Sequence, residues 1–298
     1  MISISICICT RKRQEGLKRI LDSLEKMQIP ENNNIKIVII ENDVENYSEN
    51  IVKKFSAKGK FKICYFLETN QGIAYARNRS IKEAGTCDFC CFVDDDQIVS
   101  SDWLVELLKC QREFDADGVW GQNPPIFNKK VPFYISHFHS PKFFDYGAIL
   151  TYAATNCLLL RKKYLDKFEG PFDIRLNFTG GEDYLLSIKI IKDGGIIRFN
   201  PNATAYEIIP NSRTTILYII KRTYRIANAG YFIQSFSEPG FKRNQAMPRL
   251  ILRLFYGLLL ILPCLIFTKK NKLKGIIKLV SAVGGINALF GKITRFYA

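Results

Sequence analysis

Residues 89–96 read FCCFVDDD, an apolar run that ends in three aspartates. A run of β-forming residues this apolar is typical of a strand buried on both faces of a sheet. Three similar runs precede it, and helix-like segments separate the four. This alternation predicts an α/β fold with a mostly parallel, Rossmann-like sheet flanked by helices. The expected strands are 3–9, 35–40, 61–67 and 89–93, and the expected helices are 14–27, 47–57, 73–84 and 102–114.

Polar side chains follow three of these strands, at the sheet edge where ligands of such folds bind. They are Thr10 and Arg11, Glu41 to Asp43, and Asp94 to Asp96. Three adjacent carboxylates repel one another unless a cation lies among them. Hard oxygen ligands suit Mg²⁺ or Mn²⁺, which commonly bridge to substrate phosphates. The aspartates therefore predict a metal–phosphate site, with a solvated acidic turn as the alternative.

Two later runs add charged groups to the same edge. In QGIAYARN, Gly72 permits a tight turn, and Arg77 lies on the first turns of the next helix, where a guanidinium can counter a diphosphate. In GGED, Glu182 and Asp183 begin a helix after two glycines. One acid there is explained by helix capping, but two are not. A carboxylate near a metal-bound diphosphate could take the proton of an attacking sugar hydroxyl.

Other classes of protein fit less well. A haloacid-dehalogenase-type phosphatase also places Asp-x-Asp after a strand, but it needs Thr or Val where Ile98 stands, and it needs that strand first in the fold. A glycosidase uses two carboxylates without a metal–diphosphate site. A catalytically inactive, membrane-bound protein that binds a nucleotide-sugar is the non-enzymatic alternative, which intact Asp96 and Asp183 disfavour.

Taken together, these motifs over residues 1–238 resemble an inverting family 2 glycosyltransferase of the GT-A fold. The resemblance rests on 5–11, 39–43, 70–78, 93–96 and 180–183. The later residues Ala205 to Glu207, Pro210, Arg213, Arg222 and Arg225 are similar to the bacterial branch of succinoglycan-type transferases, which assemble surface polysaccharide or lipopolysaccharide.

The resemblance implies a role for each matched residue. Asp43 and Glu41 would meet the uracil of a UDP-sugar, with Thr10 and Arg77 nearby. Asp94 and Asp95 would bind the ribose or support the metal, and Asp96 would ligate Mg²⁺ or Mn²⁺. Asp183 would be the general base of a single displacement with inversion, and Glu182 would contact a saccharide or lipid-linked acceptor. Glu207 stands where many relatives have a metal-binding His, and Glu41 where many have Asp; His137 and His139 lie in a loop instead.

The end of the chain differs in charge from the rest. The net charge is +15, yet the first 238 residues hold 32 basic and 28 acidic groups. From Pro239 onward there are 11 basic residues and no Asp or Glu, among the apolar runs 250–267 and 273–290. This composition favours an anionic membrane surface over a nucleic acid. We predict a catalytic domain over 1–238 and a membrane-associated helical segment over 239–298, peripheral or monotopic on the cytoplasmic face of the cell membrane rather than a two-span hairpin.

The nine cysteines lie largely within strand-like runs, where Cys acts as a small hydrophobe. No N-terminal signal peptide is visible, so a reducing cytoplasm is expected. The cluster Cys87, Cys90 and Cys91 lacks a second Cys or His pair at zinc-ligand spacing, and we predict no zinc site there.

Overall fold

The structure is a computed structural model that describes residues 1–238, 240–261 and 269–295. It divides into two compact units, which we name after their contents. The sheet unit comprises residues 1–128, 139–177 and 182–209, and the helical unit comprises 129–138, 178–181 and 210–298.

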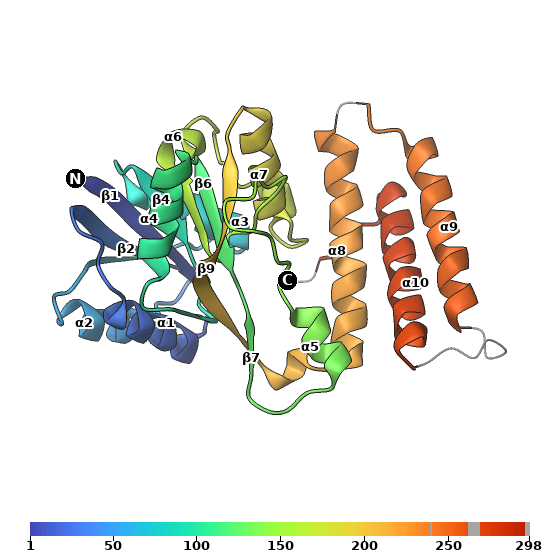
Figure 1. Cartoon of the computed structure of the whole chain (residues 1–298), viewed down its shortest axis with the longest axis horizontal. Helices are drawn as coiled ribbons and strands as arrows, with labels where there is room; N and C mark the ends of the chain where they lie inside the picture. Colours follow the sequence, from blue (N-terminus) through green and yellow to red (C-terminus); the bar gives the residue numbers. More distant parts are fainter. Residues whose placement is uncertain (239, 262–268, 296–298) are drawn as a thin grey trace. The chain divides into compact units, whose positions relative to one another are not determined.

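The sheet unit is built on nine strands, which Figure 1 shows at its centre. Along the sheet their order is β3-β2-β1-β4-β8-β6-β9-β5, and β7 pairs with β9. Four strands form the parallel half, with β1 paired to both β2 and β4. The strands are β1 (Ile2–Thr10), β2 (Asn33–Glu41), β3 (Lys62–Leu67), β4 (Phe89–Phe92), β5 (Gln97–Val99), β6 (Gly118–Gln122), β7 (Pro125–Phe127), β8 (Leu158–Arg161) and β9 (Ile197–Ile209).

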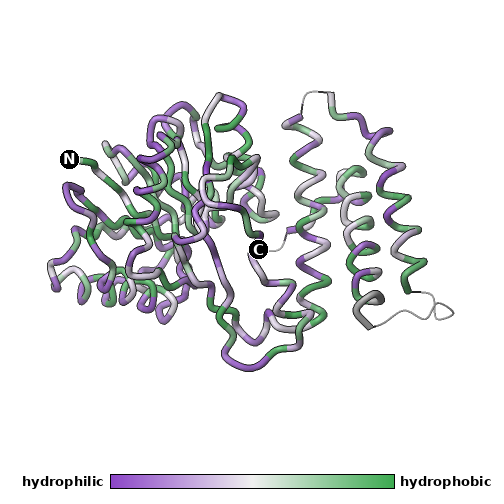
Figure 2. Tube along the Cα trace, in the orientation of Figure 1, coloured by the Kyte–Doolittle hydropathy of each residue, from purple (hydrophilic) through white to green (hydrophobic). Residues whose placement is uncertain are grey.

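Helices cover both faces of this sheet. Apolar residues of α1 (Gln14–Lys26), α2 (Glu49–Ser56) and α4 (Trp103–Phe114) share one core cluster with alternate residues of β1, β2 and β4. The opposite cluster holds residues of α3 (Ile73–Ala84), α6 (Lys162–Leu165) and α7 (Glu182–Lys192). The central strands are apolar along most of their length (Figure 2), as strands buried on both faces require. The predicted α/β sheet with flanking helices is confirmed.

The second half of the sheet differs in detail from the prediction. Strand β8 runs antiparallel to both β4 and β6, and the short β5 runs antiparallel to β9. The single long strand β9 pairs with β6 in its first half and with β5 and β7 in its second. His137 and His139 lie in a short helix, α5 (Phe133–His139), rather than in a loop.

The helical unit contains the 3₁₀ turn η2 (Asn211–Arg213), α8 (Ile216–Ser237), α9 (Arg243–Ile261) and α10 (Lys269–Leu289). The 3₁₀ turn η1 (Ile174–Leu176) belongs to the sheet unit. The Thr215 hydroxyl caps α8 by accepting from the Tyr218 N–H. Asn228 on α8 donates to the carbonyls of Gly284 and Lys292, and its own side-chain oxygen accepts from Thr294. These bonds tie α8 to α10 and to the chain that follows it.

The C-terminal compact unit therefore begins at Pro210, upstream of the boundary expected at Pro239, because α8 packs with α10, which also packs with α9. The end of the apolar run expected over 250–267 lies outside the described residues. Helix α10 already begins at Lys269. Among the helices described, none combines the length and the apolar composition that crossing a bilayer would need.

Candidate active site

The carboxyl end of β1 meets the aspartates that follow β4. Thr10 is buried, and its hydroxyl donates to the Asp95 carboxylate at 2.8 Å. Arg13, on the loop after β1, lies 2.9 Å from Asp95 and 3.4 Å from Asp96. Burial raises the pKa of Asp95 to about 6, although Arg13 and Thr10 oppose the rise. This places Thr10 and Asp95 together, as the sequence predicted.

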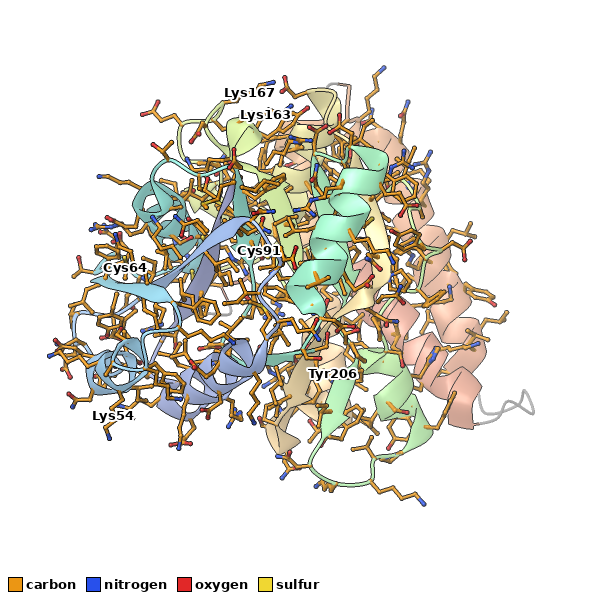
Figure 3. All side chains as sticks on the ribbon, turned by 60° about the vertical axis from the view of Figure 1, so that its left-hand side comes forward. Lys54, Cys64, Cys91, Lys163, Lys167 and Tyr206 are labelled. Carbon is orange, nitrogen blue, oxygen red and sulfur yellow. The ribbon has the colours of Figure 1, made fainter. Side chains whose placement is uncertain are left out.

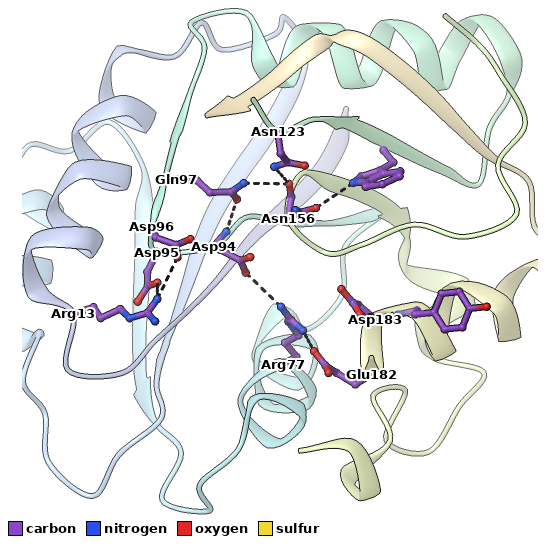
Figure 4. Close-up of polar contacts among 12 residues, drawn as sticks. Arg13, Arg77, Asp94, Asp95, Asp96, Gln97, Asn123, Asn156, Glu182 and Asp183 are labelled. Carbon is purple, nitrogen blue, oxygen red and sulfur yellow. Dashed lines mark hydrogen bonds and ion pairs between the residues drawn. The ribbon is translucent and has the colours of Figure 1, made fainter. Parts of the chain in front are cut away.

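A second set of contacts joins β4 to α3 and α7 (Figure 4). Arg77 is buried on α3; its guanidinium lies 3.4 Å from Asp94 and directly contacts the Glu182 carboxylate. Burial disfavours the charged guanidinium, but Glu182 and Asp94 outweigh it and raise the pKa of Arg77. Arg77 is therefore the positive group that lets two carboxylates approach one another here.

Glu182 is itself buried, and one of its two carboxylate oxygens has no hydrogen-bond partner among the residues that the structure describes. Burial raises the pKa of Glu182 to about 7 against the opposing effect of Arg77. The other oxygen of Glu182 pairs with Arg77, so removing Arg77 would leave a charged carboxylate buried without that partner. Its geometry makes Glu182 the group that orients Arg77.

Asp183 follows in the first turn of α7, on the same side as Arg77 and Asp94 in Figure 4. One carboxylate oxygen accepts from the Tyr184 N–H at 2.7 Å, which fixes the side chain. The turn before α7 has φ of +79° at Gly180 and +92° at Gly181. Only glycine adopts such values without strain, which explains the glycine pair that precedes the acids.

The loop after β2 holds the other predicted nucleotide-binding residues. Asp43 is buried but lies 3.4 Å from Arg11 and 3.3 Å from Lys12. Burial alone would raise its pKa, yet the Val44 N–H and Lys12 lower it overall. Glu41 is fully buried and accepts from the Lys12 N–H and the Ser48 hydroxyl. Its carboxylate shapes the loop after β1.

Sequence reasoning assigned no role to two asparagines that shape this edge. Asn42 donates to the carbonyls of Glu68 and Asn70 and accepts from the Gly72 N–H, so one amide joins the ends of β2 and β3 to the start of α3. Asn177 accepts from the N–H groups of Ala74 and Tyr75 at the first turn of α3. A run of polar residues in the sequence pointed to Asn42, but Asn177 is far away in the chain and carried no signal.

Whether a divalent cation fits this edge of the sheet depends on the carboxylate oxygens of the aspartates that follow β4. Burial, together with repulsion from Asp96 and Asp183, raises the pKa of Asp94. A cation bound beside these carboxylates would reduce that repulsion and stabilise their charged forms. Among the described residues, no three acidic, His or Cys side chains converge to form a complete metal site. Mg²⁺ in nucleotide sites is commonly held by one or two carboxylates plus substrate phosphates, so Asp94 and Asp96 fit such an ion.

The pairing of strands β5 and β9 places Glu207 near the aspartates that follow β4. It stands opposite Gln97 in the β5–β9 pair, and the following Ile208 N–H donates to the Asp96 carbonyl at 2.9 Å. Gln97 in turn accepts from the Asp94 N–H and donates to the Asn156 carbonyl. The backbone thus holds Glu207 close to the aspartates in register.

The comparisons with known proteins agree with this arrangement. The family described as Glycosyl transferase family 2 matches residues 5–168, which is more than half of the chain. The chain is also 31% identical over 227 residues to the succinoglycan biosynthesis protein ExoM of Rhizobium meliloti (strain 1021), covering 75% of this chain and 72% of that protein.

Solved structures resemble the fold. A mannosyltransferase of Pyrobaculum calidifontis, in complex with GDP-Man and Mn²⁺, matches with a TM-score of 0.67 at 13% identity, covering 97% of this chain and 87% of its own. S. aureus TarS (residues 1–349) with UDP matches with a TM-score of 0.56 at 17% identity, covering 99% and 93%.

A parallel half-sheet with acidic residues at its carboxyl edge, and this sequence match, define the class of protein. The chain belongs to glycosyl transferase family 2 and has the GT-A fold. The predicted resemblance to this family is confirmed.

Proposed function

We propose that the protein transfers a sugar from a UDP-sugar to a hydroxyl of a saccharide or lipid-linked acceptor, with inversion, in the assembly of a surface polysaccharide or lipopolysaccharide. The observation that carries the proposal is the set of charged groups at the carboxyl edge of the sheet, where Asp94, Arg77, Glu182 and Asp183 come together. Similarity to a succinoglycan biosynthesis protein supports the acceptor class.

Each residue has a task in this reaction. Asp183 takes the proton from the acceptor hydroxyl, because its carboxylate is fixed by the Tyr184 N–H and lies on the same side as Arg77 and Asp94. Glu182 holds Arg77 in place; at this position Glu182 could also contact the acceptor. Asp43 and Glu41 lie at the loop that would face the uracil, and Asp95 would bind the ribose with Thr10 behind it.

Asp96 and Asp94, with Glu207 beside them, would hold Mg²⁺ or Mn²⁺. A bound divalent cation supplies positive charge that offsets the charge developing on the departing diphosphate. The structures of related fold support such an ion, since one of them contains Mn²⁺ with a nucleotide-sugar. Arg77 adds a second positive charge at the same edge.

The donor-binding part is tested by calorimetry of UDP with the purified protein. Binding is expected in Mn²⁺ or Mg²⁺ and is expected to be lost in EDTA, and Asp96→Asn should remove the metal-dependent part. Asp22→Asn, on α1, removes one negative charge elsewhere and serves as the control. Equal UDP affinity with metal and with EDTA would contradict the proposal. A panel of nucleotide-sugars, assayed for metal-dependent hydrolysis, then identifies the donor.

The helical unit gives the second part of the proposal, a position on the cytoplasmic face of the cell membrane. Helix α9 exposes large apolar side chains at Ile251, Leu252, Phe255, Leu258 and Leu259. At 100° per residue these five occupy one face of the helix, and Arg243 and Arg249 each lie about 60° beyond one edge of that face. An apolar face bordered by basic residues is typical of a helix that lies in the headgroup region of an anionic bilayer.

Such a position would hold the active site near a lipid-linked acceptor. Co-sedimentation of the full-length protein with liposomes tests it. Binding should be stronger to anionic than to neutral liposomes and should weaken, without vanishing, at high salt, because the apolar face also contributes. Protein that remains in the supernatant with anionic liposomes would contradict the membrane proposal while leaving the proposed chemistry untouched.

A further inference from the structure

A pair of thiols lies at the start of β4, at the opposite end of that strand from the aspartates. Cys87 and Cys90 are three residues apart, and their sulfur atoms lie 3.9 Å from each other. The sequence offered this cluster only as a metal site, and no group of three metal ligands includes it among the described residues. The pair is outside the proposed active site and has no part in the chemistry assigned there.

The two thiols differ sharply in exposure. Cys90 is fully buried beneath α3, whereas Cys87 is half-buried. Cys87 lines a pocket of about 590 Å³ in the sheet unit, whose charged lining residues are Lys82, Lys162 and Asp166. A small reagent in this pocket would thus meet Cys87, whereas Cys90 is buried behind it at 3.9 Å.

The surroundings of Cys87 favour its thiolate. The largest effect on the pKa of Cys87 is the hydrogen bond that the Cys90 thiol donates to the Cys87 thiolate. Burial opposes the ionisation of Cys87. The Ser5 hydroxyl and the positive charges of Lys162 and Lys36 favour the ionisation. Together these lower the pKa of Cys87 to about 6. The neighbouring Asp88 carboxylate is engaged by the N–H and hydroxyl of Ser3. Hydrogen bonding with Cys87 and Cys7, together with burial, raises the pKa of Cys90.

We propose that Cys87 is a nucleophilic thiol that exchanges with small anionic disulfides entering this pocket, and that Cys90 resolves the product. The Cys87 thiolate attacks one sulfur of the disulfide RSSR; a Cys87–SR bond forms, and RS⁻ leaves. Cys90 then attacks the Cys87 sulfur as its proton passes to RS⁻, a Cys87–Cys90 bond forms, and a second RS⁻ leaves. The protein dithiol is oxidised by two electrons, and RSSR is reduced to two thiols.

The second step, in which the Cys87–Cys90 bond forms, requires the two sulfur atoms to move closer together. The two sulfurs must approach from 3.9 Å to a bond length of about 2.05 Å, which the bend between α3 and β4 must allow. Cys90 is held in β4 opposite Ser5 and Leu160. The movement therefore falls on Cys87, which lies before the strand.

The test treats the reduced, full-length protein with oxidised glutathione, an anionic disulfide, and maps the products by peptide mass spectrometry. We expect a Cys87–Cys90 disulfide in the unaltered protein and a stable glutathione adduct on Cys87 in Cys90→Ser. Cys64, half-buried on the outermost strand β3 (Figure 3), is the matched control thiol. Cys64→Ser should leave both products unchanged, and Cys87→Ser should form neither.

A second readout does not depend on any variant folding. Iodoacetamide alkylation of the unaltered protein at pH 6 should be about tenfold faster at Cys87 than at an ordinary thiol, since the larger thiolate fraction outweighs the lower nucleophilicity of an acidic thiol. Equal rates at Cys87 and Cys64, or glutathione attached mainly to other cysteines, would overturn the proposal. A stable adduct on Cys87 in the unaltered protein would overturn the role of Cys90.

Discussion

The buried charged residues of the sheet unit are largely paired with opposite charges, whereas the charged residues at the end of the helical unit are all of one sign. In the sheet unit the buried charged groups meet partners within the chain: Arg77 meets Glu182 and Asp94, and Asp95 meets Arg13. From Pro239 onward the chain has 11 basic residues and no acidic one. Charged groups that pair with one another inside the fold can build a site within the protein. A surplus of positive charge, in contrast, favours binding to a negatively charged partner outside the protein. Variants that remove charges from one unit at a time separate these two uses of charge.

The largest expected effect is on the proposed base. Asp183→Asn keeps the size of the side chain and its bond to the Tyr184 N–H, so the free energy of unfolding should change by less than about 1 kcal/mol. Sugar transfer should fall by roughly 10²–10⁴-fold, as is usual when a general base is lost. Asp193→Asn, near the other end of α7, is the control for charge. Near-normal transfer by Asp183→Asn would make Asp183 a structural residue.

The next effect is on stability. Arg77→Met leaves Glu182 buried without its partner, which should cost about 3–5 kcal/mol in urea denaturation at pH 8. The loss should be smaller at pH 5, since burial raises the pKa of Glu182 to about 7 and the carboxyl can take up a proton. Arg77→Met/Glu182→Leu should recover much of the loss.

Arg175→Met is the matched control for that pair. Its partner is Asp173, and the Arg175 side chain is 56% exposed, so the change should cost about 0–1 kcal/mol. If both arginine variants lose the same stability, the difference between buried and exposed pairs argued for this protein is wrong.

A third effect depends on pH. Burial holds the pKa of Asp95 at about 6 in the folded protein, above about 3.9 in the unfolded chain, so the folded form binds this proton more tightly. The resulting stability is complete below about pH 4 and is lost as pH rises through 6. Relative to Asp95→Asn, the unaltered protein should therefore lose up to about 2–3 kcal/mol between pH 4 and 7. Urea denaturation in EDTA measures this difference; a difference independent of pH would show that Arg13 cancels the burial of Asp95.

The smallest effect concerns the surplus of basic residues. Arg243→Gln/Arg249→Gln should weaken binding to anionic liposomes by about tenfold to thirtyfold, since each basic residue near the surface contributes about 1 kcal/mol. Lys53→Gln/Lys54→Gln, on α2 of the sheet unit, removes the same charge and should have little effect (Figure 3 labels Lys54). Equal weakening by both pairs would mean that net charge alone, rather than α9, attracts the protein to the bilayer.

The parallel half of the fold could be predicted because its signals are local. The strands β1 to β4 are mostly apolar, and the polar residues after β1, β2 and β4 make the edge of the sheet. The antiparallel strands were harder to predict. Strand β5 has only three residues, Gln97–Val99, and is defined by its pairing with β9 rather than by its own sequence.

The same distinction holds for the site. Asp94, Arg77, Glu182 and Asp183 were predicted to share one edge, and the structure brings them together there. The sequence could not show that Glu182 is buried against Arg77, because that contact joins residues 105 positions apart. Asn177, which accepts from the first turn of α3 although it is distant in the sequence, was not predicted for the same reason.

Strand β9 has a consequence for insertions and deletions. Its first residues pair with β6, Glu207 pairs with Gln97, and the register shifts between these two stretches, at Gly121 and Gln122 of the partner strand. A deletion of one residue between 200 and 204 would bring Ile208 opposite Gln97 and turn every following side chain to the other face of the sheet. A change of two residues would keep the faces but displace Glu207 by about 7 Å along the strand. The length of this segment, as much as its composition, thus determines which side chain is presented beside Asp96.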